Sequence, residues 1–194
     1  MKRTILVLSA ALAMLLCGAR QANADGITYT ESATATGIIG TTSFTRALVT
    51  ITFTGDTSNV TEPSLGLFLN TVGTATVTIG GVGTFAFTDS LNVFDNQTAQ
   101  AAGITDIHGL GDILDTFNSA FGTYDLTTAI GPVTDVSLFS PGGLDATTGG
   151  LLRLGGDVSN STFTATIVTT PEPSSLLLLG MGIAGLVMVR RRLL

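Results

Sequence analysis

The chain has 194 residues, enough for one domain once short segments at its two ends are set aside. Its charge is uneven: residues 25–170 contain two arginines and thirteen carboxylates, a net charge of −11, and no lysine. Because so acidic a surface repels phosphate backbones, we expect no nucleic-acid binding by this part of the chain.

The first 24 residues have the three parts of a secretory signal peptide. Two basic residues precede an apolar run over residues 5–16, which we expect to form a signal helix. Ala22 and Ala24 then supply the small-x-small pattern that signal peptidase accepts, and this predicts cleavage before Asp25.

Cys17, the only cysteine, lies inside this segment. An alternative interpretation is a lipoprotein signal, in which the lipidated cysteine becomes the first mature residue. Such signals generally have small residues before the cysteine, whereas Leu15 and Leu16 stand here. Cleavage after Ala24 would leave a mature protein with no disulfide, thiol nucleophile or cysteine metal ligand.

The pattern of residues 25–169 predicts an all-β extracellular domain. Apolar residues alternate with threonine over residues 49–54, 74–79 and 162–167, a period of two typical of strands with one buried face. Glycines within residues 80–83 predict a hairpin turn after the second run. Turn signals recur at short intervals, so we expect eight to ten strands in a single β-sandwich or jelly-roll-like domain.

Residues 104–121 depart from this alternation, because their apolar residues recur at intervals of three and four. A short helix, a long crossover loop, or a strand over residues 112–117 would each fit this stretch.

Candidate catalytic motifs are few. His108 is the only histidine, and no Gly-x-Ser-x-Gly motif accompanies it, so we expect it to be structural or exposed. Residues 109–111 begin like a dinucleotide-binding turn but lack its third glycine and its βαβ context. We therefore predict a protein that is not an enzyme and has no cofactor.

Two groups of polar residues could supply oxygen ligands to Ca²⁺: Asp106, Asp112 and Asp115, or Asp89, Asp95 and Asn96. Neither group follows the spacing of an EF-hand or of a glycine-rich nonapeptide repeat. Because Asp and Asn at such positions are usually turn formers, we predict no metal site.

Threonine makes up 32 of residues 25–170. Alternating threonines place hydroxyl groups about 6.6–7 Å apart along one face of a strand, and flat arrays of this kind can order water on ice. Such arrays need several adjacent strands in register, whereas these runs are scattered irregularly along the chain. We therefore expect the threonines to serve mainly as β-formers that tolerate solvent.

Residues 170–194 form a third segment of different composition. A Pro-Glu-Pro sequence precedes residues 174–189, which contain no charged residue, and three arginines follow. As a helix, these 16 residues would span about 24 Å, slightly less than a hydrocarbon core of about 30 Å. Positive charge stays cytoplasmic, so the pattern predicts a transmembrane helix with the body of the protein outside.

This tail resembles the PEP-CTERM sorting signal of Gram-negative bacteria, which is also catalogued as an ice-binding protein C-terminal domain. The resemblance covers residues 171–192 and implies an exosortase, a membrane transpeptidase that cuts near the motif and passes the protein to the surface or extracellular matrix. It implies no catalytic residue in this chain, because the nucleophile belongs to the exosortase. The recognition residues would be Pro171, Glu172 and Pro173, and the stop-transfer cluster Arg190, Arg191 and Arg192.

We expect an exported structural protein, anchored in the inner membrane as a precursor and then placed at the cell surface or outside the cell. The alternatives are a carbohydrate- or Ca²⁺-dependent adhesion module and, with less support, ice binding or hydrolysis. The chain has no Trp and two Tyr, which disfavours an aromatic glycan platform. The expected partners are signal peptidase, exosortase, the membrane through residues 174–189, and extracellular polysaccharide.

Overall fold

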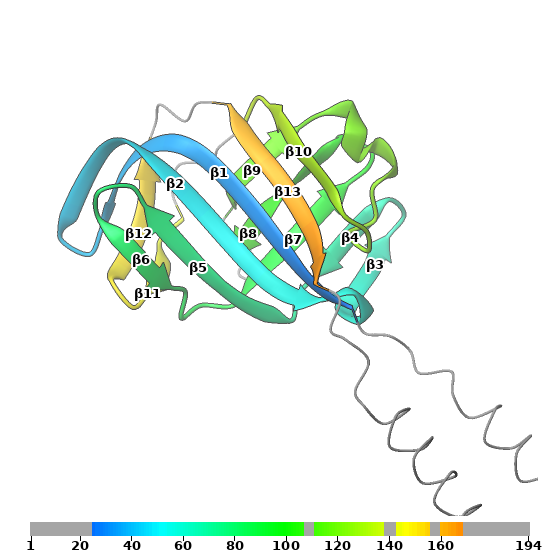
Figure 1. Ribbon diagram of the computed structural model, residues 1–194, viewed down its shortest axis with the longest axis horizontal. Coiled ribbons are helices and arrows are strands. Elements are labelled where there is room, and N and C mark those ends of the chain that lie inside the picture. The colour runs from blue at the N-terminus through cyan, green and yellow to red at the C-terminus, as the bar shows by residue number, and fades with distance from the viewer. Residues whose placement is uncertain (1–24, 107–110, 138–142, 156–159, 169–194) are drawn as a thin grey trace, which may run out of the picture.

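The computed structural model describes residues 25–106, 111–137, 143–155 and 160–168. Within these ranges the chain is all-β, as predicted, and forms two sheets that face each other (Figure 1). None of the described segments is a helix long and apolar enough to cross a membrane. The predicted signal helix, the predicted transmembrane helix and His108 lie outside the described residues.

The larger sheet, sheet A, has eight strands and the main order β10-β13-β1-β2-β5-β6. One edge of β1 is shared, because β13 pairs with its first half and β12 with its second half. The strands are β1 (Gly26–Ile39), β2 (Thr42–Asp56), β5 (Gly73–Ile79), β6 (Gly83–Ala86), β10 (Ile130–Asp135), β11 (Asp145–Thr147), β12 (Gly150–Gly155) and β13 (Ser161–Val168).

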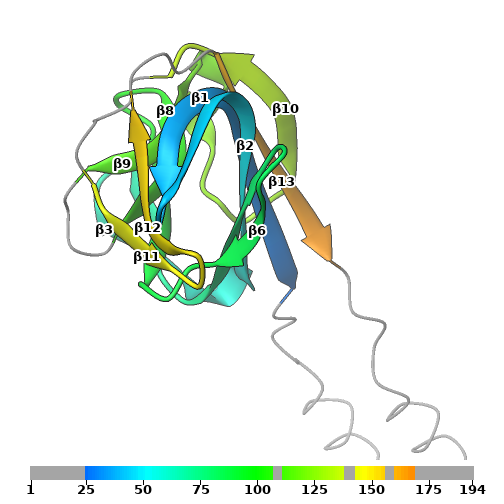
Figure 2. The same ribbon diagram turned by 90° about the vertical axis from the view of Figure 1, so that its left-hand side faces the viewer.

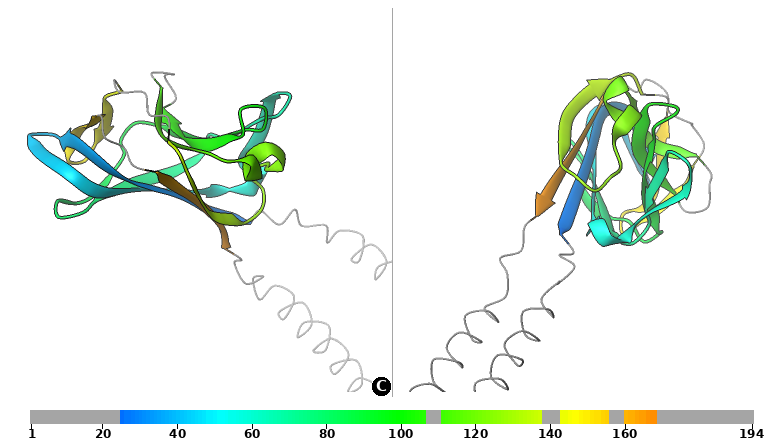
Figure 3. Two further views of the ribbon diagram at one scale, coloured as in Figure 1. Left: turned by 90° about the horizontal axis from the view of Figure 1, so that it is seen from above. Right: turned by 90° about the vertical axis from the view of Figure 1, so that its right-hand side faces the viewer.

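The smaller sheet, sheet B, has five strands in the order β3-β4-β7-β8-β9. Its strands are β3 (Val60–Ser64), β4 (Leu67–Asn70), β7 (Leu91–Asn96), β8 (Ala101–Asp106) and β9 (Asp112–Phe117). Two 3₁₀ turns, η1 (Thr57–Asn59) and η2 (Ser119–Thr123), complete the described elements. Figure 3 (right) shows the two sheets on either side of the core.

Strand β9 decides among the alternatives for residues 104–121. The strand interpretation of residues 112–117 is confirmed and the helical one is wrong. Antiparallel pairing with β8 places Ile104 opposite Leu114, with both side chains fully buried. Pairing of these apolar positions within the sheet therefore outweighs the weak helical spacing of the sequence.

The hairpin predicted at residues 80–83 is confirmed, between β5 and β6. Val82 donates its backbone N–H to the carbonyl of Ile79 at 3.0 Å, and Gly81 has φ +76°. This left-handed conformation carries little cost for glycine, which has no Cβ. The described residues contain thirteen strands rather than eight to ten, because several short strands follow one another closely.

Sheet A closes on itself at the end far from the chain termini. Beyond β6, an isolated bridge joins Phe87 to Thr147 of β11. Strand β11 pairs with β12, and β12 pairs with β1. The series of pairings that starts at β1 and runs through β2, β5 and β6 therefore ends at β1 again. Figure 2 looks onto this closed end, where β6, β11 and β12 lie together.

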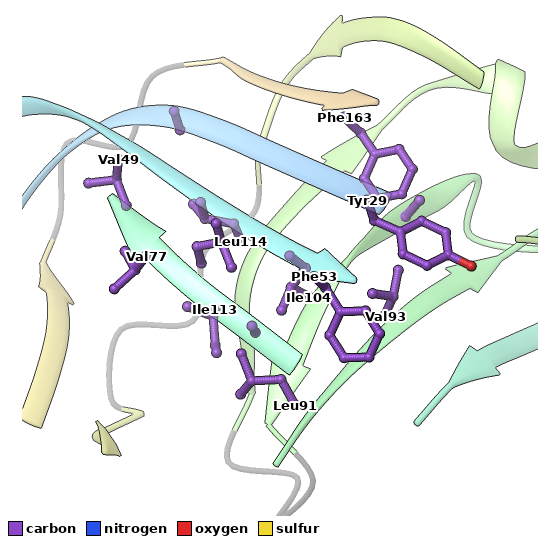
Figure 4. Close-up of a cluster of buried hydrophobic side chains, with 14 of the residues drawn as sticks. Tyr29, Val49, Phe53, Val77, Leu91, Val93, Ile104, Ile113, Leu114 and Phe163 are labelled. Carbon is purple, nitrogen blue, oxygen red and sulfur yellow. The ribbon is translucent and has the colours of Figure 1, made fainter. Parts of the chain in front are cut away.

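The core lies between the sheets and contains a group of packed aromatic rings. The ring of Phe163 packs edge-to-face against Phe121 with centroids 5.6 Å apart, and lies 6.2 Å from both Tyr29 and Tyr124. The 3₁₀ turn η2 brings Phe121 into this group. Figure 4 shows Tyr29 beside Phe163, with aliphatic side chains of both sheets extending from them along the core.

The two ends of the described body lie side by side. Gly26, at the start of β1, pairs with Val168, the last residue of β13. Both segments beyond the body therefore begin at the same end of sheet A (Figure 1).

Candidate functional site

The outer face of sheet A carries rows of hydroxyl side chains that cross neighbouring strands in register. The middle row consists of Thr164, Thr30, Thr52 and Thr76, on β13, β1, β2 and β5. The row nearer the termini consists of Thr166, Thr28, Thr54 and Thr74. The third row crosses all six strands of the main order: Thr134, Thr162, Ser32, Thr50, Thr78 and Thr84.

These three rows, which we call the threonine face, correct the expectation that the threonine runs are scattered. The runs are irregularly spaced in sequence, but strand order decides which of them become neighbours. Residues in the rows are separated by about 4.7–4.9 Å across strands and about 6.6–7 Å along them. No charged or aromatic residue belongs to the rows, so the threonine face is a neutral array of hydroxyl and methyl groups.

Hydroxyl groups of the threonine face are exposed or half-buried, and some bond to each other across strands. The Oγ1 atoms of Thr78 and Thr84 are 2.8 Å apart, and so are those of Thr134 and Thr162. Adjacent strands of a sheet rotate by about 20–25°. A rigid crystal plane such as ice would therefore match only part of this surface, whereas a flexible hydroxylated polymer can follow it.

A buried hydrogen-bonded chain joins the two sheets. Oε1 of Glu31, on β1, lies 3.0 Å from Oγ1 of Thr116, on β9. That Oγ1 lies 2.6 Å from Oγ of Ser161, on β13, which donates to the backbone carbonyl of Asp115 at 2.5 Å. Burial, the largest cause, raises the pKa of Glu31 well above its usual range; the charges of Asp115 and Asp112 add to this, and the Thr116 hydrogen bond opposes it.

The number of available protons gives an independent indication of the charge state of Glu31. The Ser161 proton goes to a carbonyl, which can only accept, so Thr116 must donate in its contact with Ser161. If Glu31 were ionised, the same Thr116 hydroxyl would also have to donate to Oε1 of Glu31, and a hydroxyl has only one proton. A protonated Glu31 supplies the missing donor. Glu31 then donates to Thr116, Thr116 donates to Ser161, and Ser161 donates to the backbone carbonyl of Asp115.

Asp95, on β7, is a second buried carboxyl group. It is 0% exposed and shares the core-facing side of its strand with Leu91 and Val93. Neither of its carboxyl oxygens has a hydrogen-bond partner among the described residues. Burial, with a smaller contribution from the charge of Asp125, raises the pKa of Asp95 to about 8.

Asn70, on the adjacent strand β4, is also fully buried. Its Nδ2 donates to the hydroxyl of Tyr29 at 3.2 Å and to the backbone carbonyl of Asp56 at 3.0 Å. Its Oδ1 has no partner within the described ranges. Burial raises the pKa of Tyr29 to about 12, so its hydroxyl stays protonated.

The two calcium groups considered from the sequence are not brought together. In the first, Asp106 pairs with the core residue Leu91, whereas Asp115 follows the core residue Leu114 and faces the other side of sheet B. In the second, Asp95 and Asn96 are consecutive on β7 and face opposite sides, and Asp89 lies about 20 Å along the chain from Asp95.

A different acidic group forms near the closed end of sheet A. Burial, followed by the charges of Asp106 and Asp89, raises the pKa of Asp145 to about 6. Oδ2 of Asp89 accepts from the backbone N–H of Ala146 at 2.6 Å, so this carboxylate holds the chain near β11. Within the described segments, no three His, Cys, Asp or Glu side chains are placed to share a metal ion.

The sequence pattern itself marks the positions of the two buried carboxyl groups. Apolar residues at alternate positions around Glu31 and before Asp95 define the inward faces of β1 and β7. Each acidic residue occupies a position at which the pattern demands an apolar one. A break of this kind marks a position where a functional or structural constraint outweighs burial cost.

The predicted processing residues lie outside the described ranges. They are Ala22 and Ala24 at the signal-peptide junction, Pro171, Glu172 and Pro173 of the sorting motif, and Arg190, Arg191 and Arg192 of the terminal cluster. The described body places their attachment points together, because Gly26 pairs with Val168.

Comparison with known proteins identifies the tail and leaves the body without a match. The PEP-CTERM protein-sorting motif matches residues 169–192, as the resemblance implied. No curated protein matches the chain, and no solved structure does so either.

Proposed function

Because this chain carries a PEP-CTERM protein-sorting motif at residues 169–192, we propose that it is a structural protein of the cell surface or extracellular matrix. The motif indicates export to the cell envelope and exosortase-dependent sorting to the surface. Signal peptidase would remove residues 1–24, and residues 174–189 would hold the precursor in the inner membrane until the exosortase acts.

One observation carries this proposal: the sorting motif begins directly after a β-domain whose last strand is already paired on both sides. Strand β13 pairs with β10 over residues 161–165 and with β1 up to Val168, and the matched motif begins at residue 169. Removal of the tail would therefore leave every described ladder of sheet A intact. Such an arrangement suits a body that is delivered folded and separated from its anchor.

A non-catalytic role is supported by the location of the two fully buried carboxyl groups whose pKa values are raised. Glu31 and Asp95 are both 0% exposed, so neither can meet a substrate without opening of the core. The described surface instead carries the neutral threonine face, in register over as many as six strands. Presentation of such a surface requires only a stable scaffold.

The test of sorting is cell fractionation in the native host and in a strain without exosortase. We expect the uncut precursor in the inner-membrane fraction of the mutant strain and the cut protein at the surface or in the medium of the wild type. A variant with Pro171, Glu172 and Pro173 replaced by alanine should behave like the mutant strain, and Arg153→Ala should sort normally. Normal release without exosortase would refute the proposal.

The threonine face favours a second function, adhesion to a neutral extracellular polysaccharide through hydroxyl hydrogen bonds. Thr52 lies in the middle row, so Thr52→Lys should weaken co-sedimentation with a neutral glucan or galactan. Leu65→Lys adds the same charge at a position that is 95% exposed in the turn between β3 and β4, and should bind normally. Inhibition of ice growth without polysaccharide binding would instead assign the surface to ice.

A further inference from the structure

The polar group around Asp95 has more acceptors than donors. The Tyr29 hydroxyl donates to the backbone carbonyl of Leu126 at 2.7 Å. Both bonds of the Asn70 amide nitrogen are used, to Tyr29 and to the carbonyl of Asp56. In this group, three buried atoms have no partner among the described residues, and all are oxygens: Asp95 Oδ1, Asp95 Oδ2 and Asn70 Oδ1.

Donors in the neighbouring loop are also used elsewhere. The Tyr124 hydroxyl donates to the carbonyl of Thr128 at 3.0 Å. The side-chain amide of Gln97 donates to the carbonyl of Tyr124 at 2.8 Å. The single Tyr124 proton is therefore not available to Asp95, and one of the two Gln97 amide protons is used as well.

The orphaned oxygens come from adjacent positions on one face of sheet B. Asp95 pairs with Phe68 and Asn70 pairs with Val93, so Asp95 and Asn70 are diagonal neighbours, with Cα atoms about 7–8 Å apart. Asp125 lies in the loop after η2, next to Leu126, whose backbone carbonyl accepts from the Tyr29 hydroxyl that Asn70 also contacts. Its charge also acts on Asp95. One Asp125 oxygen accepts from Thr127, at 3.0 Å from N and 2.7 Å from Oγ1.

The described chain offers no cationic side chain to this group. Its two arginines are exposed, Arg46 on β2 and Arg153 on β12. Arg46 is seven residues along β2 from Phe53, the partner of Tyr29, a distance of about 23 Å at 3.3 Å per residue. Arg153 pairs with Ile38, which is nine residues and about 30 Å along β1 from Tyr29.

We propose that Asp95, Asn70 and Asp125 bind a single Ca²⁺ ion at this end of the core. Their carboxylate and amide oxygens are the ligands that Ca²⁺ prefers, and two carboxylates balance its charge. Ca²⁺ takes six to eight oxygens in flexible geometry, so water can complete a shell that octahedral Mg²⁺ would fit less readily. The ion would tie β4 and β7 to the loop after η2, whichever function the threonine face serves.

The two tyrosines of the chain offer a direct probe. Tyr29 bonds to Asn70, and the backbone carbonyl of Tyr124 bonds to Gln97 beside the site. The chain has no tryptophan to compete for excitation. Terbium(III), a luminescent substitute for Ca²⁺, should therefore emit on tyrosine excitation when it is bound here, with saturation at one ion per chain and displacement by Ca²⁺.

The experiment uses the full-length chain, purified in a non-ionic detergent and stripped with EGTA. In addition to terbium emission, we expect Ca²⁺ at a hundredfold excess over its Kd to raise Tm by about 5 to 10 °C. Asp95→Asn should abolish both effects. Glu31→Gln, which changes another fully buried carboxyl, should retain both.

Asp125→Asn keeps the proposal testable if Asp95→Asn does not fold. Asp125 is half-buried in a loop, and asparagine can still accept from Thr127. We expect at least tenfold weaker terbium binding for this variant. Absence of sensitised emission, a Tm that does not respond to Ca²⁺, or equal binding by Asp95→Asn or Asp125→Asn and wild type would overturn the proposal.

Discussion

Replacement of Glu31 by glutamine should make the protein more stable at neutral pH and reduce its sensitivity to pH. The folded protein holds Glu31 protonated inside the core, whereas the unfolded chain exposes an ordinary carboxyl group that ionises above about pH 4.3. The glutamine amide can donate to Thr116 in the same direction as the protonated acid. The substitution therefore keeps the hydrogen-bonded chain and removes the titration.

The sign of the effect follows from the raised pKa of Glu31. Stability from this group is fully present at low pH and is lost as pH rises from the unfolded pKa toward the folded one. Each pH unit in this window costs the wild type about 1.4 kcal/mol relative to Glu31→Gln. This corresponds to about 3 to 6 °C in Tm per pH unit for a chain of this size.

The measurement is urea unfolding of both proteins between pH 5.5 and pH 8. Other buried acids contribute to each curve, so the informative quantity is the difference in unfolding free energy between the two proteins. Glu62→Gln is a control, because Glu62 is exposed and a glutamine oxygen can still accept from the N–H of Gly66. Parallel curves for Glu31→Gln and wild type would show that Glu31 is ionised when folded, and the proton count would be wrong.

Two further substitutions test the packing. Phe163→Ala removes a fully buried ring from the centre of the aromatic group and should cost about 3–5 kcal/mol in urea unfolding, whereas Phe163→Leu, which refills much of the volume, should cost less than half as much; equal losses would show that the lost volume is not the cause. Gly73→Ala should cost about 1–3 kcal/mol in the same assay, because its Cβ would meet the Thr54 carbonyl and lie 2.5 Å from the Phe53 ring. Gly26→Ala, whose Cβ would make only ordinary contacts with Val168, should be nearly neutral, and a similar loss for both would contradict the steric reason.

The all-β class and several strands were accessible from the sequence because alternation reports burial directly. The runs at residues 49–54, 74–79 and 162–167 lie in β2, β5 and β13. Which of these strands lie next to each other could not be predicted from the sequence. Strand β13 lies beside β1 although more than a hundred residues separate them, and nothing local in either strand specifies that pairing.

The candidate sites show a similar division. Asp106 and Asp115 are close in sequence and were grouped for that reason. Side chains alternate between the two faces of a sheet, and these two residues lie on opposite faces of sheet B. Asp95, Asn70 and Asp125 come from two strands and a distant loop, so only the folded chain reveals their proximity. The sorting tail was recognisable because its signal is contiguous and needs no tertiary contact to be read.

The pairing of Gly26 with Val168 has a mechanical consequence. A pull applied to Val168 along the axis of β13 loads the ladder to β1 over residues 162–168 and the ladder to β10 over residues 161–165. These bonds then resist in shear and share the force, whereas a pull across the strand would open them one after another. A tether attached at this residue therefore meets the sheet in its more resistant direction.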